Sequence, residues 1–186
     1  MNINIRLTTL ADCTAVMSLF DAARRTMAGL GIDQWQNGYP FLSDIEADIA
    51  AGESYVATEN GRIIGTFMLM KRAEPTYATV YDGNWLTPAE IPYATVHRIT
   101  VAPDCRASAR GKDKSGSVSA QMMAFIKDYA LRAELGGGVK VDTHEGNIAM
   151  RRMLEKQGFI HCGVILLADG QKRVAYQWLP ERHTEV

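Results

Sequence analysis

The sequence of 186 residues lacks an excess of charge of either sign. Twenty Lys and Arg residues stand against 21 Asp and Glu residues, which gives a formal net charge of −1 at pH 7. Proteins that bind nucleic acids or anionic membranes through their overall charge carry a basic excess. The balance therefore argues against both kinds of binder, and only a local basic patch could serve an anionic ligand.

Cysteine is scarce, and long apolar runs are missing. Cys13, Cys105 and Cys162 form no Cys-x-x-Cys pair and no Cys/His spacing typical of a zinc site. Reduced thiols in the cytoplasm explain this usage better than a disulfide framework. No apolar run approaches the ~20 residues of a membrane span, and the N-terminus lacks the order of a signal peptide. We therefore expect a cytoplasmic protein that binds no metal, nucleic acid or membrane.

The composition is that of an ordinary globular protein, with 47% hydrophobic and 22% charged residues. A chain of this length hides roughly 70% of the surface that its unfolded form exposes, so its core needs no disulfide or metal for support. We find no linker, repeat or low-complexity segment. The sequence predicts a single domain over residues 1–186, with 180–186 as a flexible tail.

Hydrophobic periodicity in the first half predicts one strand, two helices and a hairpin. The strand covers residues 2–8, and capping-box patterns at Thr9-x-x-Asp12 and Ser43-x-x-Glu46 each predict the start of a helix. Asn60-Gly61 suits the positive φ angles of a type I′ turn between two antiparallel strands. A further short strand is expected around residues 79–82.

The second half alternates strands and helices. A buried strand is expected over 93–101, a helix from about Val118, and a short strand over 139–143. Asn147 is a good N-cap for the next helix, which Gly158 ends, and a hairpin follows. The order β-α-α-β-β-β-α-β-α-β-β predicts a mixed α/β fold.

Two segments of this second half resemble the GNAT family, the Gcn5-related N-acetyltransferases. One is His97-Arg98-Ile99-Thr100-Val101-Ala102-Pro103-Asp104-Cys105-Arg106, which is similar to that family's fourth strand and the start of its acyl-CoA loop. The other runs from Asp142-Thr143-His144-Glu145-Gly146-Asn147 to Gly158-Phe159. The resemblance implies a GNAT fold: a central mixed sheet with splayed parallel strands 4 and 5, flanked by about four helices.

The resemblance implies acetyl-CoA as the acyl donor. In the family, the pantetheine amides satisfy unpaired main-chain groups of the fourth strand, and the pyrophosphate lies at the N-terminus of the next helix, where free N–H groups favour an anion. The residues of this chain that the resemblance assigns to the cofactor are Ile99, Thr100, Val101, Arg106, Lys114, Ser115, Gly116, Ser117, Val118, Ser119 and Asn147.

The cofactor loop departs from the family pattern. Ser117 and Ser119 replace two motif residues that are usually small glycines, and the stretch before the helix is several residues longer than usual. A serine hydroxyl can bind phosphate, but its Cβ limits close approach of the backbone. Four basic residues against one acidic residue over 106–114 indicate an anion site, and a solvated surface loop is the alternative interpretation.

The general acid and the general base of the reaction are harder to assign. The family commonly places an acidic Tyr seven residues after the capping Asn, and this chain has Leu154 there. For the base, an attacking ammonium with an ordinary pKa of about 10.4 must lose a proton. His97 and His144 are the candidates for this catalytic role. A buried structural histidine and a turn residue before a helix are the respective alternatives.

In the family, the loop between the first two helices roofs the acceptor pocket. Its aromatic residues Trp35 and Tyr39 are therefore candidates for substrate binding, and packing on the core is the alternative. The resemblance implies an enzyme that transfers an acetyl group from acetyl-CoA to a primary amine of a small molecule or peptide by direct attack. The competing hypothesis is a GNAT-fold binding or regulatory module that has lost efficient use of acyl-CoA. The sequence leaves a homodimer open.

Overall fold

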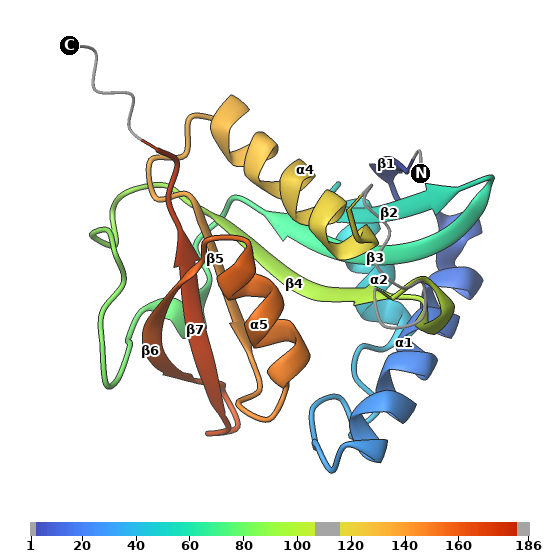
Figure 1. Ribbon diagram of the computed structural model, residues 1–186, viewed down its shortest axis with the longest axis horizontal. Coiled ribbons are helices and arrows are strands. Elements are labelled where there is room, and N and C mark those ends of the chain that lie inside the picture. The colour runs from blue at the N-terminus through green and yellow to red at the C-terminus, as the bar shows by residue number, and fades with distance from the viewer. Residues whose placement is uncertain (1–2, 107–115, 182–186) are drawn as a thin grey trace. The chain divides into compact units, whose positions relative to one another are not determined.

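The computed structural model describes residues 3–106 and 116–181 (Figure 1). Within these ranges the chain forms four α-helices and a seven-stranded sheet of order β1-β2-β3-β4-β5-β7-β6. The sheet is mixed, and β4 and β5 are its parallel neighbours. The predicted fold class is therefore confirmed, and so is the predicted order of helices and strands.

The chain divides into two compact units. Unit 1 consists of Met1–Leu69 and Val96–Phe125, and unit 2 of Met70–Thr95 and Ile126–Val186. Two elements have residues in both units, β4 (Ala94–Val101) and α4 (Val118–Arg132). No helix in the described ranges combines the length and apolar character that crossing a membrane requires.

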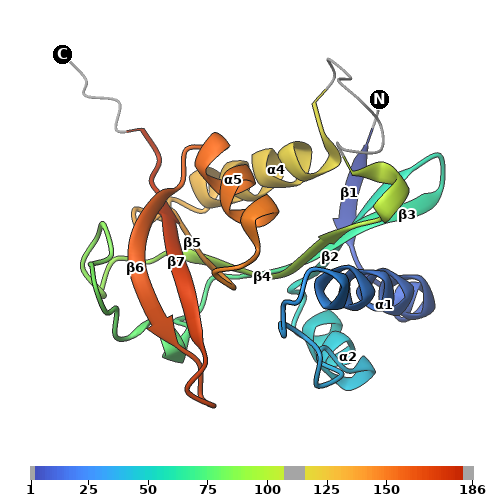
Figure 2. The ribbon, with the colours of Figure 1, turned by 60° about the horizontal axis from the view of Figure 1, so that its bottom comes forward.

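Unit 1 begins with a strand and two helices. Its elements are β1 (Asn4–Leu7), α1 (Cys13–Gly29), α2 (Leu42–Ala50), β2 (Ser54–Glu59) and β3 (Arg62–Met70). The three strands pair antiparallel in sequence order, and Figure 2 shows α1 and α2 together on one side of them. Asn60 and Gly61 both have positive φ angles, of 49° and 78°, so the predicted β2–β3 turn is confirmed.

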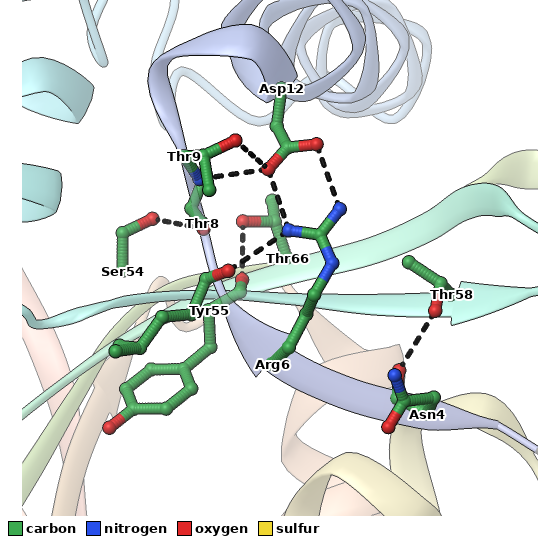
Figure 3. Close-up of polar contacts among 10 residues, drawn as sticks. Asn4, Arg6, Thr8, Thr9, Asp12, Ser54, Tyr55, Thr58 and Thr66 are labelled. Carbon is green, nitrogen blue, oxygen red and sulfur yellow. Dashed lines mark hydrogen bonds and ion pairs between the residues drawn. The ribbon is translucent and has the colours of Figure 1, made fainter.

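The start of α1 is fixed by a network around Asp12 (Figure 3). The Asp12 carboxylate accepts hydrogen bonds from the backbone N–H and the hydroxyl of Thr9, both at 2.8 Å. The two terminal nitrogens of Arg6 on β1 donate to the same carboxylate at 2.7 and 2.9 Å. The predicted capping box is confirmed, and it opens with a 3-10 turn at Leu10–Asp12.

The start of α2 differs from the sequence prediction. The N-cap is Phe41, whose N–H donates to the Asp44 carboxylate at 2.7 Å, and Ser43 lies inside the helix. The predicted cap at Ser43-x-x-Glu46 is therefore wrong. Asp44 performs the reciprocal half of a capping box by itself, because its short carboxylate reaches back to the N-cap N–H.

Unit 2 is built on a three-stranded antiparallel sheet and one helix. Its elements are β5 (Val139–Thr143), α5 (Ile148–Lys156), β6 (Ile160–Leu166) and β7 (Lys172–Trp178). β7 pairs with both β5 and β6, and the hairpin of β6 and β7 is labelled in Figure 1. The core gathers Tyr77, Tyr93, Cys162, Ile165 and Ala175.

Residues 71–93 cover this core without forming the strand expected around 79–82. Tyr81 makes a single isolated bridge with Val164, and Gly83 and Gly163 allow the two backbones to meet. A Cβ on Gly83 would lie 2.2 Å from the Cys162 carbonyl oxygen, so only glycine fits there. The segment is held to the sheet by backbone contact at single points rather than by a ladder.

Candidate functional site

The end of β4 and the start of α4, both in unit 1, carry most of the residues predicted to bind the cofactor. Thr100 is buried, and Ile99 and Val101 are partly buried. Gly65 on β3 permits close packing here, because a Cβ at that position would lie 2.9 Å from the Met122 sulfur of α4 and 3.3 Å from the Thr100 carbonyl oxygen. The backbone of this strand end thus packs closely against β3, its neighbour in the sheet, and near Met122 of α4.

Arg106 follows β4 and is tied to the protein itself. Its Nε donates to the Val101 carbonyl at 3.2 Å, and its Nη1 donates to the Thr26 hydroxyl of α1 at 3.1 Å. Burial lowers the pKa of its guanidinium. Arg106 therefore orients the end of β4, and a contact to phosphate stays a prediction for it.

The N-terminus of α4 shows how serine replaces the family glycine. Gly116 has a φ of +85°, and the Ser117 hydroxyl accepts a hydrogen bond from the Ala120 N–H at 3.2 Å. The hydroxyls of Ser117 and Ser119 lie 3.1 Å apart. Val118 is buried at 1% exposure, so only its backbone could meet a ligand. Lys114 and Ser115, also predicted to bind the cofactor, lie outside the described residues, as do Arg110 and Lys112.

The two predicted substrate-binding aromatics behave differently. Trp35 packs edge-on against Phe20 with ring centres 5.7 Å apart and joins the hydrophobic cluster of unit 1. This is the core-packing role weighed as its alternative. Tyr39 instead accepts a hydrogen bond from Arg98 of β4. Burial raises the pKa of Tyr39, and Arg98 opposes that rise.

Arg98 was not singled out from the sequence. Its Nη2 donates to both carboxylate oxygens of Asp48 on α2, at 2.7 and 2.6 Å, and contacts the Met68 sulfur at 3.1 Å. Burial raises the pKa of Asp48, and Arg98 opposes the rise. A lone arginine within an apolar strand was the available signal, because a charge is rarely buried unless it is paired. Its partner, 50 residues away, carried no local signal.

His97 lies partly buried in β4, beside Arg98. In unit 2, His144 follows β5, and its Nδ1 accepts a hydrogen bond from the Gly146 N–H at 3.0 Å. A neutral imidazole with that bond carries its hydrogen on Nε2. This is the geometry of the turn residue considered as the alternative for His144, and the catalytic roles of both histidines stay predictions.

Asn147 caps α5 as predicted. Its Oδ1 accepts a hydrogen bond from the Met150 N–H at 3.2 Å. Leu154, which occupies the position of the family's acidic Tyr, is buried at 0% exposure. α5 therefore offers no acid at that position.

Unit 2 contains a buried lysine that was not singled out from the sequence either. Lys140 on β5 is 1% exposed, and its Nζ lies 4.5 Å from the ring centre of Trp85 and 3.9 Å from that of Tyr93. Burial lowers the pKa of Lys140 to about 8. On the same strand, Asp142 accepts a hydrogen bond of 2.7 Å from the hydroxyl of Tyr77, and burial raises the pKa of that tyrosine well above its ordinary value.

No cluster of three or more His, Cys, Asp or Glu side chains suited to a metal occurs in residues 3–106 or 116–181. The start of α4 carries the hydroxyls of Ser117 and Ser119 and the first backbone N–H groups of the helix. These are donors suited to an anion and to amide-rich chains rather than to a cation.

The sheet order, the parallel β4 and β5, and the helix that begins after β4 define a mixed α/β fold of GNAT type. No family model matches the sequence, and no curated protein matches it either. Solved structures do. A GNAT-family acetyltransferase of Streptococcus agalactiae 2603 is 32% identical, with a TM-score of 0.79, and the match covers 97% of this chain and 96% of that one.

Two more distant structures share the fold. A GNAT-family acetyltransferase of Listeria monocytogenes 4b F2365 is 22% identical with a TM-score of 0.69, and the match covers 96% of this chain and 95% of that one. The yncA protein of Salmonella typhimurium, solved with its cofactor acetyl-CoA, is 18% identical with a TM-score of 0.57, over 98% of this chain and 96% of its own. With the 32% identity to the streptococcal protein, these findings show that the chain belongs to the GNAT family of acetyltransferases.

Proposed function

We propose that this protein transfers an acetyl group from acetyl-CoA to the primary amine of a small molecule or peptide. The observation that carries the proposal is the 32% identity, over 97% of the chain, with the streptococcal GNAT acetyltransferase. The acetyl-CoA in the Salmonella yncA structure supports the choice of donor. In the proposed reaction the amine nitrogen attacks the thioester carbon directly, a C–N bond forms, the C–S bond breaks and CoA leaves as a thiolate.

Two stretches of unit 1 would hold the donor. Main-chain groups of Ile99–Val101 would pair with the pantetheine amides. The Val101 carbonyl keeps a second lone pair beside the one that Arg106 uses. The first N–H groups of α4, together with the hydroxyls of Ser117 and Ser119, would bind the pyrophosphate. A role of Asn147 in cofactor binding stays a prediction.

The serines in the loop support an enzyme as well as they support a module that has lost its cofactor. Ser117 keeps a cap on α4, and the left-handed residue that the turn requires is Gly116, with a φ of +85°. The replaced glycines are thus not needed for the backbone to turn here. The alternative, a binding or regulatory module, has no observation in its favour.

The proton of the attacking ammonium needs an acceptor, and His97 on β4 is the first choice. His144 already uses Nδ1 to accept from Gly146, and its other nitrogen then carries a hydrogen. For the leaving group, a simple thiol has a pKa of about 8.5, so the thiolate can depart near neutral pH without the acid that Leu154 replaces.

Calorimetry with acetyl-CoA and acetyl-pantetheine tests the proposal. We expect acetyl-CoA to bind at least about tenfold more tightly, because only it carries phosphates for the α4 N-terminus. The Ser119→Glu variant, which adds a negative charge there, should weaken acetyl-CoA binding about tenfold. Ser18→Glu adds the same charge on the exposed face of α1 and should change nothing.

The outcomes separate the hypotheses. Absence of acetyl-CoA binding would refute the enzyme and favour the module. Equal affinity for the two thioesters would refute the pyrophosphate site at α4.

A further inference from the structure

A buried ion pair in unit 1 has no part in the chemistry proposed above. Arg98 and Asp48 have side chains that are 11% and 9% exposed, and their shortest contact is 2.6 Å. Removing two charges from water costs more than their attraction returns in many proteins, so a buried pair is weak evidence of a role in stability. The pair therefore calls for another explanation.

Arg98 carries two further costs. Its backbone φ is +55°, in the left-handed region that side chains with a Cβ disfavour. Its Nε is buried and has no hydrogen-bond partner in the described chain. Both features cost free energy, and strained residues of this kind persist where the surroundings hold them, most often at functional sites.

The contacts of Arg98 show what it holds. Nη1 donates to the Tyr39 hydroxyl, and the guanidinium carbon lies 5.6 Å from the centre of the Tyr39 ring. Tyr39 belongs to the loop over residues 30–41 that joins α1 to α2. From α1, Arg24 Nη1 donates to three successive carbonyls of this loop, those of Gly38, Tyr39 and Pro40, at 3.0, 3.2 and 3.2 Å.

The two arginines divide the work. The Arg24 guanidinium meets the loop at main-chain carbonyls, so it sets the path of the loop, and its Nη2 pairs with Asp21 of α1 at 2.6 Å. Arg98 binds the Tyr39 side chain, and Asp48 fixes the guanidinium from α2. Since Arg98 directly precedes Ile99–Val101, the same residue joins a strand end to the loop.

We propose that Arg98 is a positioning residue for the acceptor amine. This proposal rests on the proposed function. Arg98 links the strand that would carry the acetyl donor to the loop that would cover the acceptor. Its guanidinium contacts Tyr39 of that loop and Asp48 of α2. Displacing the guanidinium frees the loop and weakens acceptor binding, while the donor strand keeps its own backbone contacts.

The first test reports on the loop without any ligand. Trp35 lies in this loop, and the Trp85→Phe and Trp178→Phe replacements leave it as the sole tryptophan of the chain. In that background, Arg98→Lys keeps the charge but loses the planar fork, and Tyr39→Phe removes only the hydroxyl. Each should raise the acrylamide quenching constant of Trp35 about twofold, and the double variant should add little, as expected for two halves of one interaction.

The control is Arg62→Lys, also in unit 1. Arg62 forms a two-pronged contact with Asp104 at 2.6 and 3.0 Å, but both side chains are 59% exposed. The Arg62→Lys variant makes the same chemical change away from the loop and should leave the quenching constant of Trp35 unchanged.

The second test measures acetyl transfer to L-alaninamide as the amine probe, with CoA release followed by its thiol. Arg98→Lys and Tyr39→Phe should each raise the KM for alaninamide about tenfold, while the Kd for acetyl-CoA stays within about twofold. A general loss of structure would instead weaken both together.

Unchanged Trp35 quenching in Arg98→Lys and Tyr39→Phe would overturn the proposal, whether or not alaninamide is an acceptor. A raised Kd for acetyl-CoA with an unchanged KM for the amine would overturn it too, because the arginine would then serve the donor. Failure of the unaltered protein to bind acetyl-CoA would refute the proposed function alone, since the quenching measurement needs no cofactor.

Discussion

Each of the two units buries a cationic side chain, and the two cations are surrounded by different chemistry. Arg98 in unit 1 meets the carboxylate of Asp48 and the hydroxyl of Tyr39. Lys140 in unit 2 meets the faces of Trp85 and Tyr93, and the described residues give it no ion pair. An anion with two oxygens fixes the direction of a guanidinium, whereas aromatic faces attract an ammonium without setting a single direction.

The difference shows in the protonation of the lysine. Aromatic faces replace only part of the lost hydration, so burial lowers the pKa of Lys140 to about 8. In unit 1 the shifted group is the anion, because burial raises the pKa of Asp48. In unit 1 the buried cation Arg98 thus makes a directed contact between segments. In unit 2 the buried cation Lys140 is a group that can lose its proton.

Removal of the anion in unit 1 should have the largest effect. Asp48→Ala leaves Arg98 buried with no carboxylate, and we expect a loss of about 3–5 kcal/mol in the free energy of unfolding. Urea unfolding at pH 7 measures it. The double variant Arg98→Met/Asp48→Leu should be less destabilised than Asp48→Ala, because it removes both charges together. A single variant that unfolds like the unaltered protein would show that the pair is solvated in solution.

Removal of the cation in unit 2 should have a smaller effect of the opposite sign. Lys140→Met deletes an ammonium that is 1% exposed, and we expect a gain of about 1–3 kcal/mol at pH 7. Part of the gain is offset by the lost contacts with the two rings, which are worth roughly 1 kcal/mol each. Lys172→Met, on the exposed part of β7 in the same unit, is the matched control and should be nearly neutral.

The pH dependence gives this prediction its sign. Below pH 8 the lysine is charged in the folded and unfolded chains alike, and the burial cost is present in full. Between a folded pKa of about 8 and an ordinary value near 10.4, the folded protein binds fewer protons, so its stability rises with pH. The advantage of Lys140→Met over the unaltered protein should therefore shrink across this interval. An advantage that is constant with pH would mean that the pKa of Lys140 is ordinary.

The smallest effect should come from a partly exposed pair in unit 1. Asp12→Asn keeps the shape of the α1 cap but weakens its bonds to Thr9 and Arg6, and we expect a loss of about 1 kcal/mol at pH 7. Arg6 holds the pKa of Asp12 well below its ordinary value, so this contribution is present above pH 4 and disappears as the pH falls through the folded pKa. Acid unfolding of the variant and of Asp21→Asn, an exposed control, measures it. Equal sensitivity to acid in the variant and the unaltered protein would exclude the pair as the cause.

Most of the fold could be predicted from local patterns. Alternation identified β1, and Asn60-Gly61 identified the hairpin of β2 and β3, because the two positive φ angles of its turn suit these residue types. The segment over 71–93 could not be predicted in this way. It is fixed by distant single contacts, such as the bond from the Gln177 side chain to the Thr87 hydroxyl 90 residues away, and such contacts leave no periodic trace.

The site was predictable only as far as the family resemblance reached. The resemblance marked the end of β4 and the α4 N-terminus, and the structure shows what each side chain does there. It could not reveal Arg98 or Lys140, because their partners are set by topology. Arg98 bonds across 50 and 59 residues, and Lys140 lies against rings from a segment without regular structure. A charged residue among apolar residues of a strand was the signal in both cases.

The left-handed backbone of Arg98 changes which face of the sheet the following side chains of β4 point to. Along a regular strand, odd and even positions point to opposite faces, and counting by two assigns each side chain to a face. A residue with a φ of +55° interrupts that count. His97 and Ile99, two positions apart, therefore need not share a face, and every assignment from Ile99 to Val101 has to be counted anew from Arg98. Two GNAT sequences can align without a gap and still place different side chains on a given face of this strand, if only one of them has a left-handed residue here.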